Sequence, residues 1–337
     1  MKKLICLLFC CLLFLPAAAQ WKWHNPMEAG FPVIQNQGFT KEIGNSYTRL
    51  PERAKGVVSE PVWNLSRHSA GLAIHFYSNA PQIKVRYTVT GSLNMPHMPS
   101  TGVSGVDLYS INSDGEWHFC FGNYSFKDTI TYTYNNIGKD RYHKQGFEYR
   151  LYLPLYNGVK WLEIGIPEDA KLEFIPVSPE KPIVLYGTSI AQGACASRPA
   201  MAWGTNLQRS LDYPLINLGF SGSARGEDAI AEYLASLDPS VFVCDYDHNA
   251  PSPEHLEKTH YPLYKIFRKA HPNTPIIFVS KPDFNPKSRD DIRRREVIIE
   301  TFNLAVNSGD ENVYFVDGSH LFDGEMRDSC TVDGCHP

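Results

Sequence analysis

The first half of the chain consists of short segments in which apolar and polar residues alternate. Each segment is rich in β-branched and aromatic residues, and Gly, Pro, Asn or Asp separates it from the next. This pattern is typical of half-buried strands. The predicted strands are residues 72–77, 83–90, 106–111, 116–121, 129–134, 147–153 and 161–166. Because no long segment with helical periodicity interrupts them, residues 20–176 are predicted to form one all-β sandwich domain, jelly-roll-like in architecture.

After this domain the hydrophobic pattern changes. Residues 177–182 are predicted to be a linker, because their prolines can continue neither a helix nor a sheet ladder. Short, wholly apolar runs then alternate with segments of helical length. The apolar runs are 183–186, 215–217, 241–244, 276–279 and 313–316, and the predicted helices are 200–211, 227–237, 253–270 and 290–306.

Such an alternation of buried strands and helices predicts a parallel sheet with helices on both faces. We therefore expect residues 183–337 to form a second, α/β domain. Ligands of these sheets bind at the carboxyl ends of the strands. Functional residues are thus expected directly after the apolar runs.

Composition supports two globular domains. The chain has 337 residues, of which 43% are hydrophobic and 20% charged, which suffices for two separate cores. The formal net charge is −4, and acidic residues flank the one dense basic run, 293–295. Nucleic acid is therefore not an expected partner.

Residues 1–19 have the pattern of a secretory signal peptide. Lys2 and Lys3 precede an apolar stretch over residues 4–15, and small residues follow up to Ala19, after which cleavage is expected. The apolar stretch is shorter than the roughly 20 residues that a membrane span needs. The mature protein is therefore expected to be secreted or periplasmic, with no insertion into the membrane.

Three of the eight cysteines lie in this apolar stretch, and five lie after it. The five are Cys120, Cys195, Cys244, Cys330 and Cys335. An odd number leaves at least one thiol free or paired between chains. In an oxidising compartment, Cys195, Cys330 and Cys335 are the best candidates for a disulfide, since they lie near the functional residues described next.

Three turns with glycine, serine or asparagine follow the first three strands of the predicted α/β domain. In residues 187–193, Ser189 stands at a strand-to-helix turn, which presents its hydroxyl and its backbone N–H at the sheet edge, as a nucleophile requires. In residues 217–224, Gly222 lets a substrate approach the backbone. In residues 245–251, the side-chain NH₂ of Asn249 can donate a hydrogen bond to an oxyanion. Each turn alone is also compatible with an ordinary βα connection.

A fourth motif lies at the end of the chain, where Asp333 precedes His336 by three residues. An aspartate in this position can accept the imidazole Nδ1–H and leave Nε2 facing a serine, so one loop supplies a base and its orienting group. The alternative is a metal site of the metallophosphoesterase kind built from Asp245, Asp247 and His248. No second cluster of carboxylates and histidines follows at another strand end, which counts against this alternative.

The order and spacing of these motifs resemble the SGNH (GDSL-type) hydrolases, and the resemblance spans residues 181–337. It implies a three-layer α/β/α hydrolase domain in which Ser189 is the nucleophile, His336 the general base and Asp333 the residue that orients it. The Ser189 and Gly222 N–H groups and the Asn249 side chain would form the oxyanion hole. Neither a metal nor another cofactor is implied.

The first domain carries a second resemblance. Residues 105–109, Gly-Val-Asp-Leu-Tyr, match the Gly-x-Asp-Leu-Tyr signature of a β domain that precedes the hydrolase domain in a bacterial SGNH subgroup. Residues 193–199 are also similar to that subgroup's segment after the nucleophile.

Three features depart from the wider family. The first motif has Gly-Thr-Ser where Gly-Asp-Ser is common, and the third has Asp-His-Asn where many members have Gly-x-Asn-Asp. Neither difference removes a catalytic atom. The sequence stops one residue after His336, where such domains usually continue into a helix, so a truncated sequence and a less firmly held loop are both open.

The resemblance implies an esterase acting on acylated carbohydrate or another small ester, because exported enzymes of this architecture often remove O-acetyl groups from polysaccharides. Arg198, Trp203, Tyr246 and His248 could line a sugar-binding cleft, although Trp203 on a helix is equally typical of a core. A lipase or thioesterase of the same fold, a metal-dependent phosphoesterase and a non-catalytic glycan-binding protein are the alternatives. The sequence determines neither the acyl group and glycan nor the oligomeric state.

Overall fold

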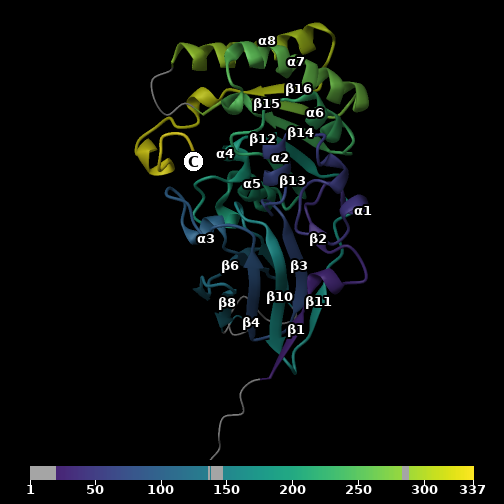
Figure 1. The fold of residues 1–337 in the computed structure, drawn as a ribbon, viewed down its shortest axis with the longest axis vertical. Helices are drawn as coiled ribbons and strands as arrows, with labels where there is room; N and C mark the ends of the chain where they lie inside the picture. Colours follow the sequence, from purple (N-terminus) through teal and green to yellow (C-terminus); the bar gives the residue numbers. More distant parts are fainter. Residues whose placement is uncertain (1–19, 136, 138–146, 283–287) are drawn as a thin grey trace, which may run out of the picture.

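The computed structural model describes residues 20–135, 137, 147–282 and 288–337, so the expected signal peptide, residues 1–19, lies outside it. Two domains are stacked along the longest axis, with the β domain below and the α/β domain above (Figure 1). Among the helices of the described ranges, none combines the length and apolar character needed to cross a bilayer.

The β domain is a sandwich of two antiparallel sheets, as predicted. One sheet has the strand order β1–β10–β4–β8–β7, and the other has β11–β3–β9–β5–β6 with β2 beside β3. In β4, Ile83, Val85 and Tyr87 are fully buried, whereas Lys84 and Arg86 point outward. Inward-facing residues of both sheets form one hydrophobic core. The strands are β1 Trp21–His24, β2 Ile34–Gln35, β3 Ala73–Ser78, β4 Gln82–Val89, β5 Asp107–Ile111, β6 Trp117–Cys120, β7 Asn123–Ser125, β8 Ile130–Asn135, β9 Phe147–Tyr152, β10 Val159–Pro167 and β11 Leu172–Phe174.

The α/β domain is built on a five-stranded parallel sheet with the order β13–β12–β14–β15–β16. Successive residues of β12 face opposite sides of the sheet, as required of a strand. Val184 and Tyr186 pack in the core shared with α6, α7 and α8, while Ile183 and Leu185 pack on the side of α5, against Trp203. Helices therefore cover both faces, as predicted. The elements are β12 Ile183–Gly187, α4 Ser189–Gln192, α5 Trp203–Leu211, β13 Leu215–Gly219, α6 Asp228–Ala235, β14 Val241–Asp245, α7 Pro253–Ala270, β15 Ile276–Val279, α8 Arg289–Asn307 and β16 Val313–Val316.

Residues 36–66, here called the bridging segment, precede the main sandwich strands but pack against the α/β domain. The segment contains the short helices α1 Thr40–Ile43 and α2 Glu60–Leu65. Its buried side chains join the same hydrophobic core as β12, β13 and β14. They are Phe39, Leu50, Ala54, Val58 and Val62. The predicted boundary at residue 176 thus separates the two sheets, but not all of the packing between the two halves of the chain.

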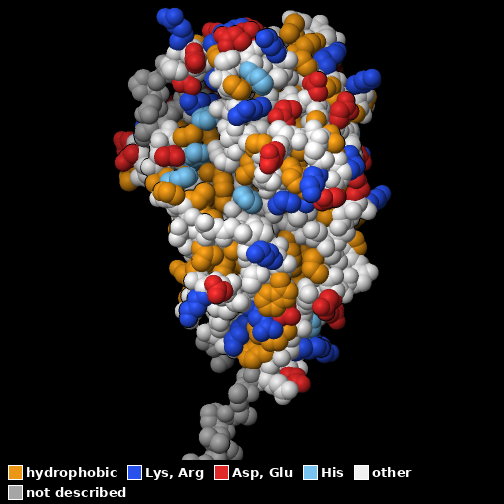
Figure 2. Space-filling view, in the orientation of Figure 1, with side chains coloured by type: hydrophobic (Ala, Val, Ile, Leu, Met, Phe, Trp, Pro, Cys, Tyr) orange, Lys and Arg blue, Asp and Glu red, His pale blue; other side chains and the backbone are white. Residues whose placement is uncertain are grey.

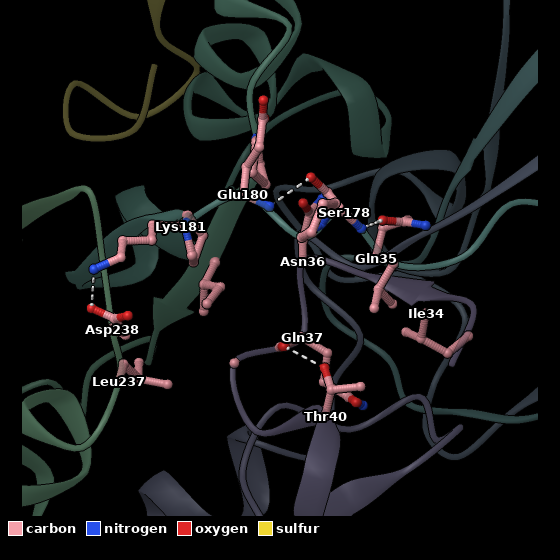
Figure 3. A pocket seen from close by; sticks show the side chains of 16 residues that line it. Ile34, Gln35, Asn36, Gln37, Thr40, Ser178, Glu180, Lys181, Leu237 and Asp238 are labelled. Carbon is pink, nitrogen blue, oxygen red and sulfur yellow. Dashed lines mark hydrogen bonds and ion pairs between the residues drawn. The ribbon is translucent and has the colours of Figure 1, made fainter. Parts of the chain in front are cut away.

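A cleft of roughly 270 Å³ lies where the linker meets the bridging segment (Figure 3). Lys181 of the linker is paired with Asp238 at 2.9 Å, and the backbone N–H of Ser178 donates to Gln35 at 3.0 Å. Pro182 and Pro214, which border the cleft, precede β12 and β13. The cleft therefore lies at the amino ends of the parallel strands, opposite the edge where Ser189 begins α4.

Candidate active site

Ser189 is the first residue of α4, directly beyond the carboxyl end of strand β12. Thr188 caps the helix, because its side chain accepts a hydrogen bond from the backbone N–H of Ile190 at 3.2 Å. Gly187 has no room for a side chain, since a Cβ there would lie 2.6 Å from the carbonyl oxygen of Asp245. This close packing of strand ends presents Ser189 at the sheet edge.

The C-terminal loop brings His336 and Asp333 to Ser189. Ser189 Oγ lies 2.7 Å from His336 Nε2, and His336 Nδ1 lies 2.7 Å from Asp333 Oδ2. In Figure 1 the end of the chain correspondingly lies beside α4. The three residues predicted as nucleophile, base and orienting group therefore form one continuous chain of hydrogen bonds.

Hydrogen bonds keep Asp333 ionised although its side chain is partly buried. Asp333 Oδ1 accepts the backbone N–H groups of His336 at 2.9 Å and Cys335 at 3.0 Å, which also closes the turn of the loop. Burial raises the pKa of the carboxyl, but the hydrogen bonds from the His336 backbone, its imidazole and the Cys335 backbone outweigh it and lower the pKa of Asp333 to about 2. The imidazole therefore faces a carboxylate at neutral pH.

Gly222 lies in the turn after β13, in a left-handed conformation with φ of 68°. The turn is held on both sides: the Phe220 N–H donates to the Gly187 carbonyl at 2.8 Å, and the Ser221 N–H donates to Gln192 Oε1 at 3.0 Å. Asn249 lies in a turn of 3-10 helix after β14, and its side-chain Oδ1 is buried without a partner in the described structure.

His248, next to Asn249, bonds the loop that carries His336. Its Nε2 lies 3.0 Å from Cys335 Sγ. Burial, assisted by the positive charge of Lys281, lowers the pKa of His248 to about 4, and burial raises the pKa of the Cys335 thiol to about 11. A neutral imidazole therefore accepts from a neutral thiol, and this contact ties the Asn249 turn to the loop of Asp333 and His336. His248 thus supports the loop that carries His336. The sequence had suggested His248 as a residue that lines a sugar-binding cleft.

The other three residues expected in a sugar cleft also have structural contacts. Tyr246 is only 1% exposed and packs on Tyr186, so it belongs to the core; its position after β14 suggested the cleft, but its side chain points inward. Trp203 packs beside the sheet on the face covered by α5. Arg198 is paired with Asp107 of the β domain at 3.0 Å and stacks on Phe119. Arg198 therefore joins the two domains, and Asp107 is the aspartate of the Gly-x-Asp-Leu-Tyr motif.

The residues of the metal alternative are largely used in packing. Asp245 is buried in the core, and burial raises its pKa well above the usual range. Asp247 accepts the backbone N–H of Lys281 at 3.0 Å. Among the described residues, the three side chains close enough to share a metal are instead Cys195, Asp333 and His336, whose ligand atoms lie within 4.8 Å of one another. That set contains the Asp333–His336 pair, which is already joined by its own hydrogen bond.

The disulfide expected among the C-terminal cysteines is not formed. In the described part of the chain, none of Cys195, Cys330 and Cys335 is in a disulfide, and neither is Cys120 or Cys244. Cys195 instead lies against the loop, with its Sγ 3.9 Å from Asp333 Oδ2.

Residues from the first half of the chain also reach the site, and no local pattern in the sequence indicated them. The ring of His97 stacks beside His336 with a centroid distance of 6.5 Å and an interplanar angle of 27°. The Tyr156 hydroxyl donates to the Ser189 carbonyl oxygen at 3.4 Å. On the surface, several histidines gather among hydrophobic side chains near the junction of the domains (Figure 2).

Two family models match the two halves of the chain. Residues 21–172 match the GxDLY model, described as the N-terminus of SGNH hydrolase-type esterases. Residues 180–337 match the GDSL-like lipase/acylhydrolase family. A search of curated proteins found no match.

Solved structures show the same two-domain fold. A protein from Bacteroides ovatus, described as a GDSL-like lipase candidate, is 32% identical with a TM-score of 0.83, covering 94% of this chain and 92% of that one. A salicylyl-acyltransferase from a tetracycline biosynthetic pathway is 18% identical, with a TM-score of 0.69 and coverage of 96% and 90%. A family two carbohydrate esterase from Clostridium thermocellum is 16% identical, with a TM-score of 0.50 and coverage of 74% and 82%. The last two likenesses concern the fold alone.

Proposed function

The chain belongs to the GDSL-like lipase/acylhydrolase family and is an ester-bond hydrolase, and we propose that it is a serine esterase with Ser189 as nucleophile. His336 is the general base and Asp333 orients it. The observation that carries this proposal is the pair of 2.7 Å contacts that joins Ser189 Oγ to His336 Nε2 and His336 Nδ1 to Asp333 Oδ2. A nucleophile, a base and an orienting group in this arrangement are what acyl transfer by serine requires.

In the first half of the reaction, Ser189 Oγ bonds to the ester carbonyl carbon while its proton passes to His336 Nε2. The carbonyl oxygen becomes an oxyanion, and Asp333 stabilises the imidazolium through the Nδ1–H bond. His336 then gives the proton to the leaving alcohol oxygen as the C–O bond breaks. The product is an acyl-enzyme on Ser189 and a free alcohol.

In the second half, water attacks the acyl-enzyme and gives its proton to His336. The tetrahedral adduct collapses, the proton returns to Ser189 Oγ, and the carboxylic acid leaves. The backbone N–H groups of Ser189 and Gly222 and the Asn249 amide stabilise the oxyanion in both halves. Stabilisation by such fixed donors is usually the largest single contribution to this type of catalysis.

The proposed substrate is an O-acetylated carbohydrate. Support comes by analogy from the fold shared with the family two carbohydrate esterase of Clostridium thermocellum, whose structure is in complex with cellohexaose. The exposed His97 beside His336 offers such a substrate a polar contact. Export fits a polymeric substrate outside the cell, and we propose that residues 1–19 are the signal that directs it.

The test of the chemistry is hydrolysis of p-nitrophenyl acetate by the purified mature chain and by its Ser189→Ala variant, each with and without EDTA. Turnover that depends on Ser189 and is insensitive to EDTA is the expected result. Turnover that survives in Ser189→Ala, or that EDTA abolishes, contradicts the serine mechanism and favours the metal alternative.

The test of the substrate is acetate release from acetylated xylan, pectin and mannan, compared with p-nitrophenyl esters of longer acyl chains. Release from at least one polysaccharide is expected. Inert polysaccharides combined with rapid cleavage of long-chain esters would overturn the carbohydrate assignment and favour a lipase.

A further inference from the structure

Arg49 of the bridging segment is buried at the carboxyl end of β13. Its Nη1 donates to the carbonyl oxygens of Gly219 at 2.7 Å and Asn217 at 3.2 Å. Its Nη2 and Nε donate to the carbonyl oxygens of Leu65 and His68 at 2.7 and 3.0 Å. One side chain thus bonds the bridging segment to the strand end from which the Gly222 turn departs.

Arg49 is an unusual buried cation, because its side chain is bonded to carbonyl oxygens and to no carboxylate among the described residues. It is 2% exposed and stacks on Phe220 at 5.0 Å. Burial lowers the pKa of Arg49 to about 9, so the guanidinium is still charged at neutral pH. Carrying an uncompensated charge into the core is costly, and perturbed charges of this kind gather at functional sites.

Tyr156, in the loop between β9 and β10, contacts both turns of the site. Its hydroxyl donates to the Ser189 carbonyl oxygen at 3.4 Å, and the Ser221 side chain interacts with the same phenol. The ring also packs against His68, with a centroid distance of 6.3 Å. One side chain of the β domain therefore spans the turn that carries the nucleophile and the turn that carries Gly222.

Gln192 extends this connection inside the α/β domain. It is fully buried on α4, three residues after Ser189. Its Oε1 accepts the Ser221 N–H at 3.0 Å, while its Nε2 donates to the Leu155 carbonyl oxygen at 3.1 Å and lies 3.3 Å from His68 Nδ1. The Ser221 N–H, one residue before the proposed donor Gly222, is thus set by a side chain whose own position depends on the first half of the chain.

Resting on the proposed function, we propose that Arg49 and Tyr156 are positioning residues for ester hydrolysis. They hold the Ser189 and Ser221–Gly222 turns at the separation that the oxyanion needs, and Arg49 adds a fixed positive charge at the strand end leading into the second turn. The β domain and bridging segment are therefore a working part of the active site and not a detachable carbohydrate-binding module.

Fixed donors contribute most when they need no rearrangement as charge develops in the transition state. Loosening the turns should therefore lower kcat while leaving ground-state binding, and hence KM, nearly unchanged. A residue that only stabilises the domain interface would lower the melting temperature without this kinetic effect.

The chain offers a matched control for Tyr156. The Tyr152 hydroxyl also crosses between the domains and donates to Gln208 Oε1 at 2.7 Å, but Gln208 lies on α5, away from both turns. Tyr156→Phe and Tyr152→Phe each remove a phenolic hydroxyl that bonds across the boundary between the two domains. Comparing them separates positioning of the site from cohesion of the two domains.

The experiment measures kcat and KM for p-nitrophenyl acetate and the inhibition constant of phenylboronic acid, which forms a tetrahedral adduct with an active serine. For Tyr156→Phe we expect kcat to fall about tenfold, less than the ~10²–10³ lost with an oxyanion donor itself. The affinity for the boronate should fall in parallel, because it resembles the transition state. Tyr152→Phe should keep the wild-type kcat.

Arg49 is tested by Arg49→Lys against Arg49→Met, with circular dichroism to verify folding. The lysine variant, which keeps the charge, is expected to retain more kcat than the methionine variant. If Arg49→Met does not fold, the comparison of the two tyrosines decides. If the wild type shows Ser189-dependent turnover and Tyr156→Phe and Tyr152→Phe have equal kcat, this inference is overturned. If the wild type shows no Ser189-dependent turnover, the proposed function itself is overturned.

Discussion

The most informative single substitution is Asp333→Asn, because the structure predicts both its local geometry and its effect on the base. Asp333 Oδ1 accepts two backbone N–H groups that close the loop, and an asparagine oxygen can accept the same two bonds. The asparagine NH₂ then faces His336 Nδ1, where the carboxylate stood at 2.7 Å. A donor in this place forces the imidazole to carry its proton on Nε2, which leaves Ser189 without an acceptor.

The magnitude follows from burial and charge. The Asp333 side chain is 33% exposed and that of His336 15%, so water weakens the carboxylate's effect on the imidazole compared with a deeply buried triad. In a serine protease whose triad aspartate is buried, loss of the correct tautomer costs about 10⁴-fold in kcat, and we expect about 10³-fold here, or about 4 kcal/mol in activation free energy.

The assay is kcat/KM for p-nitrophenyl acetate at neutral pH, with thermal unfolding as the check on folding. Asp323→Asn is the matched control, because Asp323 Oδ2 also lies 2.6 Å from a histidine Nδ1, that of His320, in an exposed pair three residues apart. The control is expected to keep its activity. A folded Asp333→Asn protein with more than about a tenth of the wild-type kcat/KM would refute the orienting role of Asp333.

Three further predictions concern packing, backbone conformation and pH. Asp107→Asn should lower the free energy of unfolding by about 2 kcal/mol in chemical denaturation, because it leaves the mostly buried Arg198 without its counter-charge; a change below about 0.5 kcal/mol would contradict this. Gly222→Ala has open space for its Cβ but a φ of 68°, so it should cost only about 1 kcal/mol of stability and yet lower kcat. Gly219→Ala would instead place a Cβ 2.3 Å from the Gln192 backbone nitrogen, and it should yield little folded protein in expression trials. The pKa of Asp333 is lowered to about 2 from an ordinary 3.8, so the stabilisation that its carboxylate gives the loop is complete above pH 3.8 and is lost as the pH falls through 2. An NMR titration of the Asp333 carboxyl with a midpoint at or above 3.8 would contradict this stabilisation.

The helices and strands of the α/β domain could be predicted from the sequence, because the residues that start helices and the apolar runs of the strands match the buried pattern of the structure. The predicted helix 253–270 is α7 itself, whose start is set by the Ser252 cap and Pro253 in its first turn. The predicted strands 276–279 and 313–316 are β15 and β16. By contrast, the hydrophobic pattern did not predict β1, β2, β7 and β11. These are edge strands of four residues or fewer, which are too short to show an alternation of apolar and polar residues.

Contacts between distant parts of the chain could not be predicted from the sequence. The order of Ser189, Gly222, Asn249 and His336 follows from the rule that ligands meet the carboxyl ends of parallel strands, and the structure brings Ser189 and His336 into contact. Arg49, Tyr156 and His97 come from the first half of the chain, where nothing in their local sequence distinguishes them from surface or core residues. Their position depends on how the two domains pack.

Side-chain direction at a strand end was the other obstacle. Tyr246 follows β14 immediately, a position that predicts a place in the cleft, but its hydroxyl lies 2.9 Å from Thr259 Oγ1 of α7, inside the core. Arg198 is polar and near the nucleophile in sequence, yet its guanidinium is bonded to Asp107. Position at the functional edge is therefore necessary for a substrate contact, but burial decides which side chains are free to make one.

The role of Ser189 as nucleophile is tested most directly by reacting the protein with a fluorophosphonate, which forms a stable adduct only with an activated serine, and locating the adduct by peptide mass spectrometry. One adduct is expected, on the peptide that contains Ser189, with loss of esterase activity in proportion to labelling. Full loss of activity with the adduct on another residue, or undiminished activity after Ser189 is fully labelled, would contradict this role.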